Sequence, residues 1–258
     1  MASSSDKNNL KEIKLNPNWQ YANFSKISTG SSFLYQTSKI SKNHTIAINA
    51  GHGTKNGHTC KTLCHPDGSP KVTGGSTKKG EIYAYAVSSG MNFPDGTPEG
   101  NINFKLAQLV KEILLDNGYN VLMIRNDYDV QLDNIARCII ANNNADIHIA
   151  LHFDSGRVNK GAFYLSVPDQ IKNIIPVKNL WEMHNNLGKF IINGLRDVGI
   201  KIFGNGNMDI DLTQTNYSTI PSIVVEMGDQ GSDTSDEQLK IMAEGLLKGI
   251  DMFFKDYK

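Results

Sequence analysis

Short apolar segments alternate with longer segments of helical periodicity from residue 44 onward, and this alternation constrains the fold more than any other feature. Five apolar runs have the length of buried strands, at 44–49, 119–124, 146–152, 161–167 and 222–226. Apolar residues recur at helical spacing in four further segments, at 98–117, 132–140, 177–197 and 235–255. This order predicts an α/β fold, a three-layer sandwich in which helices flank a mostly parallel twisted sheet.

Two regions lie outside this alternation. Residues 1–43 are polar and rich in Ser, Asn and Lys, and they carry aromatic residues only between Trp19 and Tyr35. We interpret them as a polar N-terminal arm or linker, or as an edge hairpin. Residues 53–97 are rich in Gly, Ser, Lys and Pro, and loops of this length are uncommon and often functional. We therefore predict one domain over 44–258 with an inserted loop at about 53–97.

Composition excludes several classes of protein. The 26 basic and 26 acidic residues give a net charge of zero, which argues against nucleic-acid binding driven by counterion release. No apolar run reaches the roughly 18–20 residues of a transmembrane segment, and the first residues carry no apolar stretch of signal-peptide type. The three cysteines cannot all pair within the chain. Cys60 and Cys64, next to His65, are interpreted as loop thiols, with a local disulfide or a small second metal site as the alternatives.

Four ionisable residues stand where the chain leaves a strand or enters a helix. His52 follows the first strand between two glycines, His152 and Glu226 end later strands, and Glu99 begins a helix. The carboxyl ends of parallel strands share one edge of a sheet, so we expect these side chains to converge. A hydrolytic zinc needs three protein ligands, an open position and a nearby base. Two imidazoles and one carboxylate would fill the ligand set, and the second glutamate would transfer protons.

Each of these residues also has a structural interpretation. A single strand-end histidine is often only a hydrogen-bonding group, and a glutamate in a first helical turn is usually a favourable charge at the helix dipole. Glu226 is harder to explain in this way, because a buried unpaired carboxylate is costly. His148 is a rival ligand on the same strand face as His152, and three residues of the inserted loop are weaker candidates: His58, His65 and Glu81.

Several ordered blocks resemble the type 3 family of zinc-dependent N-acetylmuramoyl-L-alanine amidases, which are bacterial and phage cell-wall hydrolases. The glycine–histidine–glycine turn at His52 is similar to the family's first block. Glu99 with Asn103 and Ala107 resembles its glutamate helix. The remaining similar blocks, within a resemblance that spans about 44–256, are Arg125-Asn-Asp127, Leu132 with Arg137 and Ala141-Asn142, Ile149-Ala-Leu-His152, and Pro221-Ser-Ile-Val-Val-Glu226-Met-Gly.

This resemblance implies that His52, Glu99 and His152 bind Zn2+ and that Glu226 is the catalytic base. It implies a peptidoglycan substrate, cleavage between N-acetylmuramic acid and L-alanine, and a place in the cell envelope or among secreted proteins. We expect a monomer. The sequence departs from the family in two places: Glu99 lies 47 positions after His52, and the segment after Glu226 reads Gly228-Asp-Gln-Gly-Ser232.

Two other functions compete with this interpretation. A zinc peptidase could cut within the stem peptide with the same ligands, and a non-catalytic cell-wall-binding module could retain zinc. The sequence leaves open whether the protein is an autolysin, a sporulation or germination enzyme, or a phage lysin. In the inserted loop, Tyr83, Tyr85 and Phe93 could contact a sugar or peptide, or could simply be surface residues.

Overall fold

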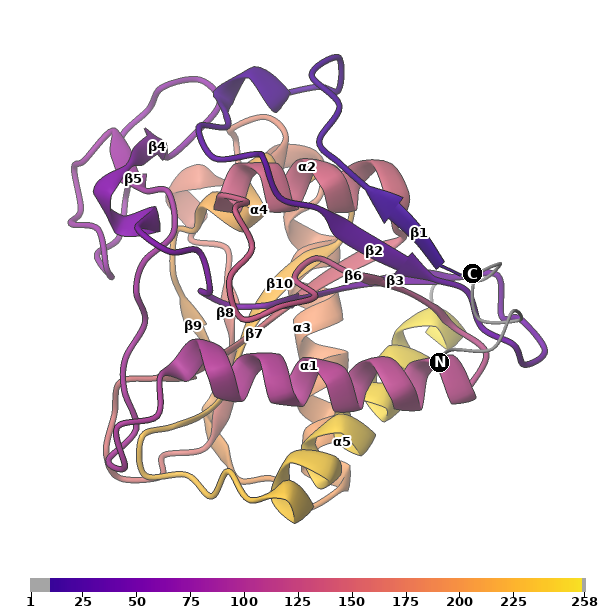
Figure 1. Ribbon diagram of the computed structural model, residues 1–258. Coiled ribbons are helices and arrows are strands. Elements are labelled where there is room, and N and C mark those ends of the chain that lie inside the picture. Colours follow the sequence, from indigo (N-terminus) through magenta and orange to yellow (C-terminus); the bar gives the residue numbers. More distant parts are fainter. Residues whose placement is uncertain (1–9, 257–258) are drawn as a thin grey trace.

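The computed structural model describes residues 10–256; residues 1–9 of the predicted arm and residues 257–258 lie outside this range. An eight-stranded sheet forms the middle layer, and four of its seven strand pairings are parallel (Figure 1). Its strands are, in spatial order, β1 (Leu10–Ile13), β2 (Ser32–Tyr35), β6 (Asn120–Met123), β3 (Thr45–Ala50), β7 (Ile147–Asp154), β10 (Ser222–Asp229), β8 (Ala162–Ser166) and β9 (Ile202–Asp209).

Helices cover both faces of this sheet. One face packs against α1 (Glu99–Asp116), α3 (Trp181–Asp197) and α5 (Asp236–Asp256), and the other against α2 (Asn134–Asn144) and α4 (Thr213–Tyr217) (Figure 1). Short 3-10 helices lie at Ala22–Phe24, Gly57–Thr59, Asp169–Ile171 and Val177–Asn179. The predicted three-layer α/β sandwich with a mostly parallel sheet is thus confirmed.

Alternation along β7 decides which side chains reach the site. Ile147, Ile149 and Leu151 point into the large core formed with α1, α3 and α5. Ala150 points the other way, into a smaller apolar cluster with Phe163 of β8. Because successive strand residues alternate between faces, His152 lies on the side away from the large core.

The insertion, residues 53–97, contains a small antiparallel pair of its own, β4 (Lys61–Leu63) and β5 (Tyr83–Tyr85). The insertion lies beside the carboxyl ends of the parallel strands (Figure 1). Residues 10–35 form a hairpin, because β1 pairs antiparallel with β2, and β2 extends the sheet through β6. No helix within 10–256 has both the length and the apolarity that a membrane crossing requires.

Among the strands of the large sheet and the α-helices that flank it, the sequence patterns missed two. β9 reads Ile-Phe-Gly-Asn-Gly-Asn-Met-Asp and shows no clear apolar alternation, because it is an edge strand whose middle residues are largely exposed. α4 is only five residues long, too short for helical periodicity to be visible. The predicted helix over 177–197 is divided into a 3-10 turn and α3.

Candidate metal centre

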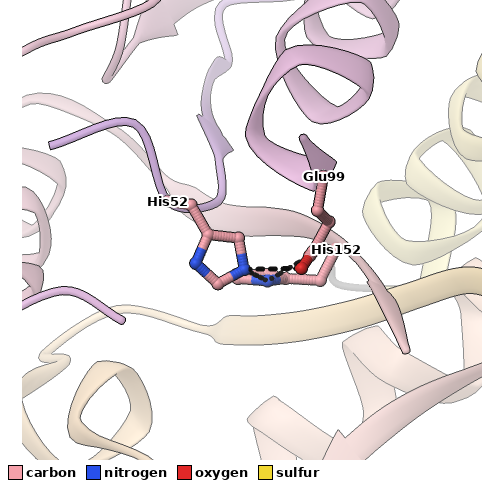
Figure 2. Close-up of side chains that lie close together, drawn as sticks. All are labelled: His52, Glu99 and His152. Atoms are coloured by element: carbon pink, nitrogen blue, oxygen red, sulfur yellow. Dashed lines mark hydrogen bonds and ion pairs between the residues drawn. The ribbon is translucent and has the colours of Figure 1, made fainter. Parts of the chain in front are cut away.

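Three of the predicted site residues meet in one cluster. Nε2 of His52 lies 2.9 Å from Oε2 of Glu99, and Nδ1 of His152 lies 3.1 Å from Oε1 of Glu99. The same His152 nitrogen lies 3.1 Å from Nε2 of His52. Figure 2 shows the three side chains pointing toward one another from the turn after β3, the start of α1 and the end of β7. Within 10–256 this is the one group of three or more His, Cys, Asp or Glu residues arranged to hold a metal ion.

The turn after β3 places His52 in a left-handed conformation, with φ of 61°, between two glycines. Gly51 is required by packing: a Cβ atom there would lie 2.3 Å from the His152 ring. The peptide carbonyl of Ser88 accepts a hydrogen bond from Nδ1 of His52 at 2.7 Å. This bond fixes the tautomer, so the unprotonated Nε2 is directed into the cluster.

Two buried arginines hold the backbone of this turn. Arg137 donates to the carbonyl of His52 at 2.6 Å and to the hydroxyl of Thr54 at 2.8 Å. Arg125 donates to the carbonyls of Ala50 and Gly51 at 3.1 and 3.3 Å. Burial lowers the pKa of Arg125 to about 9 and that of Arg137 to about 10, so both remain charged at neutral pH. Their hydrogen bonds to the backbone carbonyls of the turn fix the position of His52.

Glu99 is almost fully buried in the first turn of α1, and its carboxylate is held from three sides. Oε1 accepts hydrogen bonds from the amide of Phe153 at 3.1 Å and from the side chain of Asn103 at 3.2 Å. Oε2 accepts one from the amide of Met91 at 3.1 Å. Burial opposes the charged form, but the two histidines outweigh it and hold the pKa of Glu99 well below its usual range. The carboxylate of Glu99 is therefore ionised at neutral pH.

Glu226 lies beside this cluster on the neighbouring strand. It pairs in register with His152 of β7 and with Phe163 of β8, so the three side chains share one face of the sheet. Its Oε2 is buried and has no hydrogen-bond partner in the described part of the chain. Burial, and then the charges of Glu99 and Asp154, raise the pKa of Glu226 well above its usual range. A bound cation would oppose these effects.

A cavity of about 860 Å³ opens beside the cluster, and His52, Glu99, His152 and Glu226 all line it. Apolar residues of β8, β10, β9 and the segment after β9 line part of it: Phe163, Leu165, Val224, Met208, Ile210 and Leu212. The insertion lines another part of it, including Tyr85. Tyr83 is half exposed and does not line it, and Phe93 is buried against Phe153, with ring centroids 5.5 Å apart.

The weaker ligand candidates are not part of the cluster of His52, Glu99 and His152. His148 is fully buried, and burial lowers its pKa to about 3. Neither of its ring nitrogens has a hydrogen-bond partner among the residues that the structure describes. His65 pairs with Asp211, with 3.0 Å between Nε2 and Oδ1. His58 lines the cavity and contacts Ser89, whereas Glu81 is exposed. Cys60 and Cys64 are free thiols.

Sequence reasoning missed the part of the insertion that surrounds the cluster. Ser88 and Met91 contact His52 and Glu99 through backbone groups, which any residue could supply. Gly90 has φ of 77°, and a Cβ atom there would lie 2.8 Å from both Oε2 of Glu99 and Cδ2 of His52. The only signal in the sequence was the glycine itself, one of several in this loop.

The chain matches the family model described as N-acetylmuramoyl-L-alanine amidase over residues 46–251, which is more than half of its length. A comparison with curated proteins gives no match. The N-acetylmuramyl-L-alanine amidase Ami1 from Mycobacterium smegmatis is similar in structure, with a TM-score of 0.69, 19% identity and coverage of 85% of this chain and 100% of that chain.

Two further solved structures show the same fold. The N-acetylmuramoyl-L-alanine amidase from Clostridium difficile 630 has a TM-score of 0.61 at 16% identity, covering 84% of this chain and 100% of that chain. AmiC2 of Nostoc punctiforme has a TM-score of 0.58 at 19% identity, covering 83% and 99%. The match of the family model shows that the chain belongs to the N-acetylmuramoyl-L-alanine amidase family.

Proposed function

We propose that this protein is a zinc-dependent amidase that hydrolyses the bond between N-acetylmuramic acid and L-alanine in peptidoglycan. Membership of the amidase family supports a peptidoglycan amidase. The observation that carries the finer proposal is the convergence of His52, Glu99 and His152 in a buried cluster, with Glu226 on the neighbouring strand.

The donor set fits Zn2+. Two imidazole nitrogens and one carboxylate, with an open cavity beside them, make the three-ligand arrangement of hydrolytic zinc enzymes. His52 would bind through Nε2, His152 through Nδ1, and Glu99 through its carboxylate. When bound, zinc supplies Lewis-acid chemistry, polarising an amide carbonyl and acidifying water. Ser88, Met91 and Asn103 orient the ligands through their hydrogen bonds.

Glu226 is the group that we expect to move protons. Its carboxylate lines the cavity next to His152, and its buried Oε2 has no hydrogen-bond partner among residues 10–256. As a base it takes a proton from the attacking water; as an acid it returns that proton to the departing amine of L-alanine. The raised pKa of Glu226 suits this exchange, because a catalytic group works best with a pKa near the working pH.

The same proposal includes a division into domains and a cellular location. Residues 44–258 form the catalytic domain, with 53–97 inserted. Residues 1–43 are the N-terminal arm, of which the segment 10–35 joins the sheet through β1 and β2. The protein binds peptidoglycan as a monomer, and it acts in the cell envelope or after secretion. We propose no role in nucleic-acid binding, because the net charge is zero.

Product identification tests the bond that is cut. Purified peptidoglycan is incubated with the zinc-loaded protein, and the products are analysed by mass spectrometry beside a Glu226→Ala control. We expect new L-alanine amino termini and free muramic acid carboxyl groups, both absent from the control. New termini within the stem peptide would make the protein a zinc peptidase. Wall binding without any new amine would make it a binding module.

A further inference from the structure

A buried residue outside the metal centre joins two parts of the cavity lining. The insertion lines the cavity with residues such as Lys71, Thr77 and Tyr85. The segment between β9 and α4 also lines it, with Ile210 and Leu212. Asp211, between these two, is fully buried; its Oδ1 accepts from Nδ2 of Asn216 in α4 at 2.8 Å, and all its polar groups also contact the insertion.

Each polar group of Asp211 bonds to the insertion. Its carboxylate lies 3.0 Å from Nε2 of His65 and accepts from the amide of Val72 at 2.8 Å. Its amide donates to the hydroxyl of Thr73 at 2.9 Å, and its carbonyl accepts from Nζ of Lys71. A single residue thus makes four contacts with residues that lie about 140 positions earlier in the chain.

His65 is charged in this arrangement. Its Nδ1 lies 2.8 Å from the carbonyl oxygen of Ser69, and its Nε2 faces the Asp211 carboxylate. Both partners are acceptors, so both ring nitrogens carry a proton. The pair is fully buried, and the loss of one partner leaves an uncompensated buried charge, which is strongly destabilising.

From these contacts we propose that Asp211, with His65, is a positioning residue that fixes the insertion as a wall of the substrate cavity and thereby sets substrate affinity. The identity of the substrate rests on the proposed function above. None of the four contacts involves His52, Glu99, His152 or Glu226, so the chemical step and the metal site do not depend on them directly. Asp211 is therefore expected to affect KM and not kcat.

The test compares Asp211→Asn and His65→Gln with the wild type. Asn cannot accept from all the donors around Asp211, because one of its two terminal atoms is itself a donor. The mildest variant, Thr73→Val, removes a single acceptor and covers the case in which the other two fail to fold. His44→Gln is the control, since His44 also faces a carboxylate, that of Asp146 at 3.7 Å, but on the surface at the start of β3.

Three quantities are measured: hydrogen–deuterium exchange of 64–85, zinc content, and KM and kcat on a soluble disaccharide tetrapeptide from peptidoglycan. We expect faster exchange at Val72 in Asp211→Asn and His65→Gln, unchanged zinc content, and KM raised at least about tenfold with kcat within about twofold. Adding the second substitution to the first should change KM little, because the two residues act as a pair. Thr73→Val should show the same effects, smaller in size.

Unchanged exchange in 64–85, or faster exchange with an unchanged KM, would overturn the proposal. A fall in kcat together with loss of zinc would also overturn it, because the residue would then support the metal centre. If the wild type itself does not cleave the tetrapeptide, the proposed function fails instead. In that case the exchange data, with binding of the same tetrapeptide to Asp211→Asn and wild type by calorimetry, still decide whether Asp211 shapes the cavity.

Discussion

Glu226 and His152 are register partners on adjacent parallel strands, so the two side chains leave the sheet on the same face and at the same level. One strand thus supplies a candidate ligand, and its neighbour supplies a carboxylate whose Oε2 has no hydrogen-bond partner within 10–256. Because the pairing is made by the backbone, a substitution at Glu226 can change the chemistry without moving His152. This relationship makes the proton-transfer role separable from metal binding by mutation.

Glu226→Gln should reduce kcat by about 10²–10⁴-fold, the usual contribution of a general acid–base group. Glutamine has nearly the same shape but cannot accept and return a proton. Zinc content, measured by mass spectrometry of the purified protein, should equal that of the wild type. Activity within a few-fold of wild type would show that another group carries the proton.

Zinc should stabilise the folded protein, and His152→Ala should abolish this effect. A ligand that binds only the folded state at 100 times its Kd adds about 2.7 kcal/mol to the free energy of unfolding. The measurement is the Tm with and without added zinc after chelator treatment. His58→Ala is the matched control, because His58 lines the same cavity but is not part of the cluster. A zinc-dependent shift that persists in His152→Ala would argue against its role as a ligand.

Gly90→Ala should weaken zinc binding and activity together. The added Cβ would lie 2.8 Å from Oε2 of Glu99, so the carboxylate or the loop must move. Gly96→Ala is the matched control: φ is 86° there and 77° at Gly90, but a Cβ at Gly96 has no neighbour within 4 Å. Both variants should lose roughly 1–2 kcal/mol of stability from backbone strain, but only Gly90→Ala should lose zinc affinity in a competition titration. Equal zinc affinity in the two variants would show that this part of the insertion does not constrain the ligands.

The stabilisation from His65 should depend on pH. Burial opposes its charged form, but the hydrogen bond and charge of Asp211, with a smaller effect of Asp67, outweigh burial and raise the pKa of His65 above 6.5. Because the pKa is higher in the folded state than in the unfolded state, charged His65 contributes its full stabilisation below about pH 6.5. This contribution is lost as the pH rises through the pKa of the folded state. The pKa of Asp211 is lowered: burial would raise it, and its hydrogen bonds, first that from His65, outweigh burial. Its contribution is therefore present above about pH 4 and lost on acidification.

Urea unfolding of wild type and His65→Gln should thus show the largest difference in free energy between about pH 4 and 6.5, and a smaller difference at pH 9. Lys71 also faces Asp211, through the backbone carbonyl, and it is unchanged in this comparison. A difference that is constant from pH 5 to pH 9 would show that the pair is not ionised in the folded protein.

The sequence predicted the parts of this molecule that depend on local pattern. The short apolar runs predicted that His152 and Glu226 lie at the ends of strands. The helical periodicity that begins near residue 98 predicted that Glu99 lies in the first turn of a helix. These positions were sufficient to expect the four side chains at one sheet edge. β9 and α4 were not predictable, because a polar edge strand and a five-residue helix carry no periodic signal.

The contacts that the insertion makes with the metal centre and with Asp211 could not be predicted from sequence patterns either. Ser88 and Met91 act through backbone groups, and a backbone carbonyl or amide leaves no trace in residue type. His65 and Asp211 are 146 positions apart, and neither lies in a periodic segment that would place it near the other. Arg137 did leave a trace, a charged residue within an apolar helix face, but its acceptors depend on the fold.

Anomalous diffraction at the zinc edge, from crystals of the zinc-loaded protein, tests the proposed metal centre most directly. We predict one strong peak within coordination distance of Nε2 of His52, Nδ1 of His152 and the carboxylate of Glu99, with Glu226 nearby but not bound. A peak at Cys60, Cys64 and His65, at His148, or on the Glu226 carboxylate in place of Glu99 would contradict the assignment of ligands and base.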